Sequence, residues 1–364
     1  MKRKSHLILL SALIMMLTGS SWTSLKKSTS SKNTKNIILF IGDGMGVSHL
    51  YAGMTVSQHT FFLNQFPYSG FSITSSADNY ITDSAAGGTA IASGVKTNNG
   101  VIGMKPDLTP VSSIIEIAHK NGLATGVVST SSITHATPAS FVAHNAGRGN
   151  YEDIAKDFLN GTADVFIGGG EDHFRKRADG KDLAEDLKNQ GYDVVYSLTD
   201  LKKSNSSKIA GLLAKEHMPK VSEGRDGVLP EIVKKAIETL SRDKDGFFLI
   251  VEGSMIDWGA HEGNIDYVTS ETIDLDKAIG VALDFAKINR KTLVVVTADH
   301  ETGGLSLTGG DISKKSITAS FAGKSHTGVM VPIFSYGPGA ENYSGIHDNT
   351  FFLENFLRQL RINN

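Results

Sequence analysis

The stretch Asn36-Ile-Ile-Leu-Phe-Ile-Gly-Asp43-Gly-Met-Gly46 decides the fold class of this chain. Its run of apolar, largely β-branched residues predicts a short strand that is buried on both faces. The glycines predict a tight turn after the strand, and Asp43 stands directly behind the apolar run. A buried strand that ends in a carboxylate suits an open α/β sheet, in which ligands bind beyond the carboxyl ends of the strands.

The same alternation of short apolar runs and helical patterns continues along the chain. Further strands are predicted at Ala124–Ser129, Val165–Ile167, Asp193–Tyr196, Phe247–Val251 and Leu293–Thr297. Helices are predicted at Ser112–Lys120, Tyr151–Leu159, Lys181–Asn189, Pro230–Leu240 and Tyr267–Ile288. This alternation favours an α/β fold with a mainly parallel central sheet and helices on both of its faces.

The last third of the chain has a different pattern. Strand-like runs at Leu305–Thr308, Ile317–Phe321 and Val331–Tyr336 follow one another with little helix between them. They predict a small antiparallel excursion near the C-terminus, before a helix at Thr350–Leu360. Since no internal repeat or long linker follows residue 35, we expect one catalytic domain with inserted loops over residues 36–364.

Two more predicted strands end in the way the first one does. Glu252 follows Phe-Phe-Leu-Ile-Val, and Asp299-His300 follows Leu-Val-Val-Val-Thr-Ala. One such acid can simply cap a helix or a turn. Three acids at the same edge of a sheet repel one another unless a cation neutralises them, which indicates a metal site.

Three further residues are candidate metal ligands. Asp257 and His261 are four residues apart, so on a helix they share a face and can bind one ion, although a solvated helix pair has the same spacing. His326, in Lys324-Ser-His-Thr-Gly, precedes an apolar strand in a loop with no amphipathic role. Taken alone, His326 fits a structural or exposed histidine better than a metal ligand.

Ser84, in Thr82-Asp-Ser-Ala-Ala-Gly-Gly, is the candidate nucleophile. A serine at the start of a helix faces free amide groups and the positive end of the helix, which together bind anions. The alternative is an ordinary N-cap serine. No Gly-x-Ser-x-Gly motif surrounds Ser84 and no histidine base is near it in sequence, so its activation would fall to a metal ion.

The composition excludes several classes of protein. The 364 residues carry 36 Lys and Arg against 38 Asp and Glu, so nothing favours nucleic-acid-specific binding. With no cysteine, the chain has no disulfide, zinc finger, iron–sulfur cluster or thiol nucleophile. Any metal ion must therefore be held by histidine and carboxylate side chains.

The N-terminus has the pattern of an export signal. Lys2, Arg3 and Lys4 precede an apolar run from Leu7 to Leu17, and small residues follow. The run is shorter than the roughly 20 residues of a membrane-spanning helix, so we expect no membrane span. A buried N-terminal helix is the alternative. We interpret residues 1–22 as a signal peptide and residues 23–35 as a leader, and we expect an exported, periplasmic or secreted protein.

Five motifs in this order resemble the signature set of bacterial alkaline phosphatases. They are Ile41-Gly-Asp-Gly-Met-Gly46, Thr82-Asp-Ser-Ala-Ala-Gly87, Glu252-Gly-Ser-Met-Ile-Asp257-x-x-x-His261, Thr297-Ala-Asp-His-Glu-Thr-Gly303 and Ser325-His-Thr-Gly328. The resemblance covers residues 36 to 340, most of the predicted mature chain. The short, glycine-rich and proline-poor chain is similar to the compact cold-adapted type.

The resemblance implies two Zn²⁺ ions and one Mg²⁺ ion as cofactors. The ligands of the first zinc are matched by Asp257, His261 and His326. Those of the second zinc, beside the nucleophile Ser84, are matched by Asp43, Asp299 and His300. The magnesium site is matched by Asp43, Glu252 and Thr137. Arg148 matches the arginine that binds phosphate, where the residues alone suggest only a surface charge.

Two positions depart from the best-known bacterial enzymes. His135 stands in place of an aspartate at the third site, so it removes a negative charge and offers a softer ligand, which weakens magnesium binding or lets zinc compete. Trp258 stands in place of a lysine near the phosphate, so we expect an aromatic wall to the substrate site and a changed phosphate affinity.

The implied reaction is hydrolysis of phosphate monoesters to an alcohol and inorganic phosphate, through a phosphoserine at Ser84. The resemblance also implies a homodimer. Related phosphodiesterases, sulfatases and phosphomutases are the enzymatic alternatives, but the segment after Ser84 lacks the Pro and Arg of the sulfatase motif. An exported protein that binds metal or phosphate without turnover is the alternative from another class.

Overall fold

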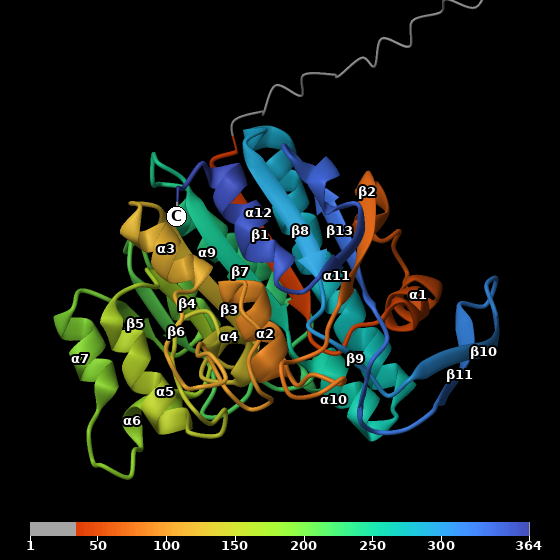
Figure 1. Cartoon of the computed structure of the whole chain (residues 1–364), viewed down its shortest axis with the longest axis horizontal. Helices are drawn as coiled ribbons and strands as arrows, with labels where there is room; N and C mark the ends of the chain where they lie inside the picture. The colour runs from red at the N-terminus through yellow and green to blue at the C-terminus, as the bar shows by residue number, and fades with distance from the viewer. Residues whose placement is uncertain (1–33, 364) are drawn as a thin grey trace, which may run out of the picture. The chain divides into compact units, whose positions relative to one another are not determined.

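The computed structural model describes residues 34–363, and its main sheet has ten strands within that range (Figure 1). The predicted signal peptide and residues 23–33 of the predicted leader lie outside the described residues. In spatial order the strands are β14 (Gly345–Asp348), β2 (Tyr68–Ile73), β13 (Val331–Tyr336), β8 (Thr292–Thr297), β1 (Asn36–Gly42), β7 (Phe247–Gly253), β3 (Ala124–Ser132), β4 (Val165–Gly169), β6 (Ile209–Leu212) and β5 (Asp193–Val195).

The pairing of the strands brings the acidic strand ends to one edge. β1 lies in the middle of the sheet and pairs in parallel with β7 and with β8. Ile41 is level with Glu252 on one side and with Thr297 on the other. Asp43 therefore leaves the sheet beside Glu252 and close to Asp299, as the three similar strand ends predict.

Helices cover both faces of the sheet, as predicted. Along β1, Ile37 and Leu39 belong to one buried apolar cluster, and Ile38 and Phe40 belong to the other. The helices of the first cluster are α2 (Ser84–Ser93), α3 (Ile114–Lys120), α4 (Ala136–Ala139), α5 (Tyr151–Asp157), α6 (Glu171–Arg175), α7 (Leu183–Asn189) and α12 (Phe351–Leu360). Those of the second are α1 (Val47–Val56), α8 (Leu198–Lys203), α9 (Val228–Leu240), α10 (Met255–Glu262) and α11 (Ile265–Asn289). Within residues 34–363, no helix combines the length and apolar character needed to span a bilayer.

The C-terminal third contains the predicted antiparallel pairs, but one of its strands joins the main sheet. β10 (Leu305–Asp311) and β11 (Ser316–Phe321) form a separate hairpin, seen at the right of Figure 1. β9 (Glu301–Thr302) and β12 (His326–Thr327) form a second, very short pair. β13 lies in the main sheet, antiparallel to both β2 and β8. Its pairing with β8 is a long-range contact that the local pattern does not specify.

Three strands of the main sheet have no counterpart in the sequence prediction. β2 alternates exposed and buried residues and contains serine and glycine, so it lacks a continuous apolar run. β14 and β6 have four residues each, and β6 includes Gly211. Short strands of this kind form because a neighbouring strand offers hydrogen-bonding partners, and their own propensity is weak.

Helix α2 lies against the acidic edge of the sheet because its residues are small. All ten of its residues are buried, and Asp83 caps its N-terminus by accepting a hydrogen bond from the backbone N–H of Ala86. A Cβ atom at Gly87 would lie 3.1 Å from the carbonyl oxygen of Asp299. A larger side chain there would push the helix, and with it Ser84, away from the strand ends.

Candidate metal centre and nucleophile

Three groups of histidine and carboxylate side chains gather where the strands β1, β7 and β8 end. In each group the candidate ligand atoms lie within 4.8 Å of one another. The outer group is Asp257, His261 and His326; the middle group is Asp43, Asp299 and His300; the inner group is Asp43, His135 and Glu252. Because Asp43 belongs to two groups, the middle and inner groups adjoin.

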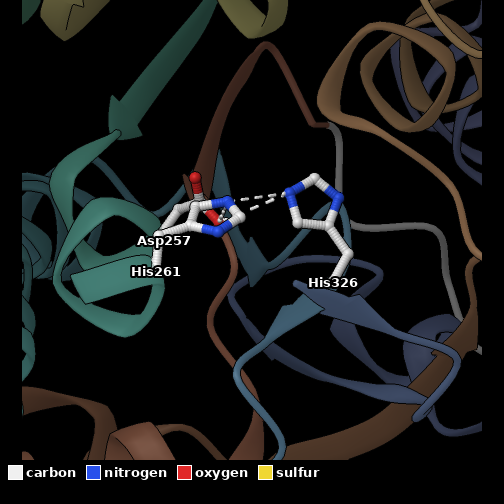
Figure 2. Close-up of side chains that lie close together, drawn as sticks. All are labelled: Asp257, His261 and His326. Carbon is white, nitrogen blue, oxygen red and sulfur yellow. Dashed lines mark hydrogen bonds and ion pairs between the residues drawn. The ribbon is translucent and has the colours of Figure 1, made fainter. Parts of the chain in front are cut away.

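The outer group joins two side chains of α10 to a histidine of β12 (Figure 2). Asp257 Oδ1 lies 3.3 Å from His261 Nε2 and 3.6 Å from His326 Nε2. The Nδ1 atoms donate to backbone carbonyls, that of His261 to Lys324 at 2.5 Å and that of His326 to Thr82 at 2.9 Å. A carbonyl oxygen only accepts, so neutral rings present their Nε2 lone pairs to the interior of the group. The two Nε2 atoms are 3.2 Å apart, an arrangement that a bound cation stabilises.

The middle group is fully buried. His300 Nε2 lies 3.4 Å from Asp43 Oδ1 and 3.3 Å from Asp299 Oδ2. Both oxygens of Asp43 and Oδ2 of Asp299 lack a hydrogen-bond partner within the described part of the chain. Burial, and then the neighbouring carboxylates, raise the pKa of Asp43 and raise that of Asp299 to about 6. Burial also lowers the pKa of His300 to about 4, so the ring is neutral and able to bind a metal ion.

The inner group lies between the end of β7 and the start of α4. Glu252 Oε1, His135 Nδ1 and Thr137 Oγ1 are buried polar atoms with no hydrogen-bond partner among residues 34–363. Burial raises the pKa of Glu252 and lowers that of His135 to about 3. Leaving buried polar atoms unpaired costs about 1–3 kcal/mol each, which an ion held by carboxylate, hydroxyl and imidazole ligands would offset.

Thr302, on β9, connects the outer and middle groups. Its hydroxyl donates to Asp257 Oδ1 at 2.5 Å and lies 3.2 Å from His300 Nδ1. Because the single hydroxyl proton goes to Asp257, the oxygen can accept from the ring Nδ1–H of His300, which leaves Nε2 of His300 without a proton. Sequence analysis did not select Thr302, although its place two residues after His300 was the available signal.

Ser84 is the first residue of α2 and lies beside the middle group. Its side chain is buried, and Oγ lies 3.2 Å from His300 Nε2. Arg148 is held close to it, because Nη1 donates to Asp83 Oδ2 at 2.9 Å. The same carboxylate oxygen accepts from the backbone N–H of Gly100 at 3.0 Å. A helix N-terminus, a serine hydroxyl and an anchored guanidinium together form an environment suited to a phosphate group.

Trp258 follows Asp257 on α10 and covers the inner group. Its ring meets those of His135 and His217 edge to face, with centroids 5.9 Å and 4.7 Å apart. The backbone N–H of Ser132 donates to His217 Nδ1 at 3.0 Å, which fixes the tautomer of that ring. His217 has no acidic neighbour at a useful spacing in the sequence, so only the fold reveals that it lies here.

Comparisons with known proteins show to which family the chain is similar. A family model described as alkaline phosphatase matches residues 34–320. "Alkaline phosphatase 3" of Bacillus subtilis is 32% identical over 424 residues, which cover 93% of this chain and 91% of the relative. The alkaline phosphatase from the Antarctic bacterium TAB5 is 43% identical, with a TM-score of 0.88 over 92% of this chain and 100% of that chain. A mutant of the TAB5 enzyme, with a histidine replaced by aspartate and Mg bound in its M3 site, is 41% identical, with a TM-score of 0.87 over 92% and 99% of the chains.

Proposed function

The chain belongs to the alkaline phosphatase family and is a metal-dependent hydrolase of phosphate monoesters, and we propose that it acts through a phosphoserine at Ser84. The observation that carries this proposal is the position of Ser84 Oγ, at the N-terminus of α2 and 3.2 Å from Nε2 of His300 in the middle group. A metal ion held by the middle group would lower the pKa of the Ser84 hydroxyl, so that no base from the protein would be required.

We propose that the outer and middle groups bind one zinc ion each and that the inner group binds magnesium. Two histidines and one carboxylate in the outer group suit zinc. In the inner group, the unpaired oxygens of Asp43, Glu252 and Thr137 suit magnesium, with His135 at the same site. The TAB5 mutant that has Mg bound in its M3 site carries aspartate in place of a histidine. Because this chain has His135 in the inner group, we expect it to bind magnesium more weakly than a site with aspartate, with zinc as the competing ion.

The protein's own residues bind and orient the phosphate. Among residues 34–363, the hydrogen bond with Asp83 is the only one that the Arg148 guanidinium makes, so its other donors are available for two phosphate oxygens. The backbone N–H groups at the start of α2 favour the same negative charge. When bound, the metal ions supply Lewis acidity that stabilises charge on the entering and leaving oxygens.

Trp258 is proposed as the aromatic wall of the substrate site. It is partly exposed beside the inner group and packs edge to face against His135. An indole carries no charge, so it attracts phosphate less than the lysine of the best-known bacterial enzymes. We therefore expect a changed phosphate affinity and product release. Broad specificity for the alcohol part of the monoester is expected for a separate reason, since few protein contacts need touch the leaving group.

A homodimer is proposed from an exposed apolar surface on the outermost strands of the sheet. Ile346 of β14 is paired in register with Phe71 of β2, and Ile73 follows on the same face. Their exposed fractions are 62%, 41% and 43%, and exposed apolar side chains that lie together favour a protein interface. Ile346→Glu should convert the dimer to a monomer in sedimentation experiments, and an unchanged mass would exclude this surface.

Export and a single catalytic domain over residues 36–364 also remain proposals. Export rests on the basic, apolar and small-residue order of residues 2–21. The single domain is supported by the main sheet, which contains strands from both ends of the described chain. β1 and β13 are nearly 300 residues apart in sequence, but only β8 lies between them in the sheet. N-terminal sequencing of the protein recovered outside the cytoplasm would give the cleavage point.

The phosphoserine is tested by trapping it. The zinc- and magnesium-loaded enzyme is mixed with an aryl phosphate and quenched in acid, and the peptide that contains Ser84 is analysed by mass spectrometry. We expect a phosphate group on Ser84, and none after prior chelation. Recovery of only unmodified peptide under turnover would argue for direct attack of water. In parallel, a diester and a sulfate ester should be hydrolysed far more slowly than the monoester.

A further inference from the structure

Among residues 34–363, the hydrogen bonds to the carboxylate of Glu252 all go to one of its oxygens. Glu252 Oε2 accepts from Ser129 Oγ at 2.5 Å and from Ser254 Oγ at 2.6 Å, and Ser131 Oγ lies 3.3 Å away. The other oxygen, Oε1, has no partner within the described residues. Glu252 and both donating serines are fully buried, so water does not compete for these bonds.

The backbone N–H of Ser131 contacts the hydroxyl oxygens of both Ser129 and Ser254. The N–H of Ser131 lies 3.0 Å from Ser129 Oγ and 3.0 Å from Ser254 Oγ, so both hydroxyl oxygens serve as its acceptors. A serine hydroxyl has one proton and two lone pairs. Ser129 Oγ also lies 3.0 Å from Ser254 Oγ and 2.8 Å from Ser131 Oγ. A carboxylate is a stronger acceptor than a hydroxyl, so we infer that both protons go to Glu252 Oε2.

The sheet holds the two serines in place. Ser129 on β3 is the register partner of Glu252 on β7, so their side chains start from adjacent points of the sheet. Ser254 follows β7 directly, and its N–H donates to Thr130 Oγ1 at 2.9 Å. The carboxylate of Glu252 is therefore held by Ser129 from the neighbouring strand β3 and by Ser254 from the end of its own strand β7.

We propose that Ser129 and Ser254 are positioning residues for the magnesium ion of the inner group. By holding Oε2, they leave the unpartnered Oε1 of Glu252 available to an ion, and Asp43 and His135 offer ligand atoms within 4.8 Å of a carboxylate oxygen of Glu252. Like-charge repulsion from Asp43 and Asp299 would otherwise turn the carboxylate away. This inference rests on the proposed function, since it assumes that the inner group binds an ion.

Residues that hydrogen-bond a metal ligand without touching the ion change the metal affinity more than the stability of the fold. Loss of a hydrogen bond that orients a metal ligand typically weakens metal binding by about 10–100-fold. If the serines only satisfied a buried carboxylate, their removal would destabilise the metal-free and metal-loaded protein equally and leave the affinity unchanged. The two roles therefore differ in a directly measured quantity.

The experiment is a calorimetric titration of magnesium into zinc-loaded full-length protein, with zinc content measured separately. Ser129→Ala and Ser254→Ala are compared with the wild type and with Ser335→Ala, a fully buried serine whose hydroxyl donates to the carbonyl of Ala340 at 2.8 Å. We expect about 10–100-fold weaker magnesium binding in the first two variants, unchanged zinc content, and wild-type affinity in the control. If one variant does not fold, the other provides the measurement.

Two results would overturn the proposal, and they are distinguishable. Wild-type magnesium affinity in both folded serine variants would show that the hydroxyls are structural only. A wild-type protein that takes up no third ion would refute the magnesium assignment of the inner group, and this inference with it, while leaving the phosphoserine route intact.

Discussion

The outer and inner groups are built in opposite ways, although both combine histidine with carboxylate. The outer group is partly exposed: 38% of the His261 side chain is accessible, and backbone carbonyls hold both ring Nδ1 atoms. The inner group is buried, His135 has an unpaired Nδ1, and a serine pair orients Glu252. The hydrogen bonds that orient the outer histidines thus exist without an ion, whereas buried polar atoms of the inner group have no partner among the described residues unless an ion binds.

Removing the metal ions should have the largest effect on activity and stability, and the order in which they leave tests the difference between the outer and inner groups. Dialysis against a chelator should abolish hydrolysis and lower the melting temperature, because an ion at 1,000 times its Kd contributes about 4 kcal/mol of stability. The exposed outer ion should leave first. Metal analysis during dialysis, with calorimetry at the start and end, measures both effects. Simultaneous loss of all ions would contradict the proposed difference between a partly exposed outer group and a buried inner group.

Ser84→Ala should have the next largest effect and leave both groups intact. Without the hydroxyl no phosphoserine forms, so kcat should fall on the order of 10⁴-fold or more. The backbone N–H groups of α2 and the metal ligands remain, so metal content and phosphate binding should be close to wild type. Steady-state kinetics and metal analysis provide the test, with Ser93→Ala at the far end of the same helix as the control. Near-normal turnover would refute the covalent route.

Thr302→Val should weaken zinc binding by the outer and middle groups and leave magnesium binding by the inner group unchanged. The variant keeps the shape of the side chain but removes the hydroxyl that contacts both Asp257 and His300. We expect about 10–100-fold weaker zinc binding, measured by competition with a chelating dye, and unchanged magnesium affinity. Thr302→Ser retains the hydroxyl and should restore zinc binding. Equal zinc affinity in the valine and serine variants would contradict this role.

The smallest expected effect is a change with pH in the stability that the metals provide. In the metal-free protein the pKa of Asp299 is raised to about 6, above its ordinary value of 3.8, so folding favours the protonated form and stability falls as the pH rises through that range. Metal binding needs the ionised form and strengthens over the same range. The difference in melting temperature between loaded and metal-free protein should therefore widen between about pH 4 and pH 7. A constant difference would mean that Asp299 does not bind a metal ion.

Much of the chemistry at this edge of the sheet was predictable from local pattern. Apolar runs that end in Asp43, Glu252 and Asp299 indicate both buried strands and carboxylates at their ends, and the spacing of Asp257 and His261 places them on one helix face. Each of these inferences needs only residues that are close in sequence. The order of the motifs then allowed a resemblance to the family, which the comparisons bear out.

The contacts that orient these side chains could not be predicted in this way. Ser129 meets Glu252 across 123 residues, Arg148 meets Asp83 across 65, and His326 meets the carbonyl of Thr82 across 244. In their own segments Ser129 is an ordinary strand serine and Arg148 resembles a surface charge, so no local pattern predicts these contacts.

Local sequence pattern is therefore sufficient to predict an α/β sheet with acids at its carboxyl edge and a serine at a helix start, and the lack of cysteine excludes thiol chemistry. The grouping of the candidate metal ligands, and the neighbours that orient them, depend on the folded chain. The physical reason is that burial and periodicity are encoded over a few residues, whereas hydrogen bonds between side chains depend on strand order and register. Those follow from packing the whole chain around β1.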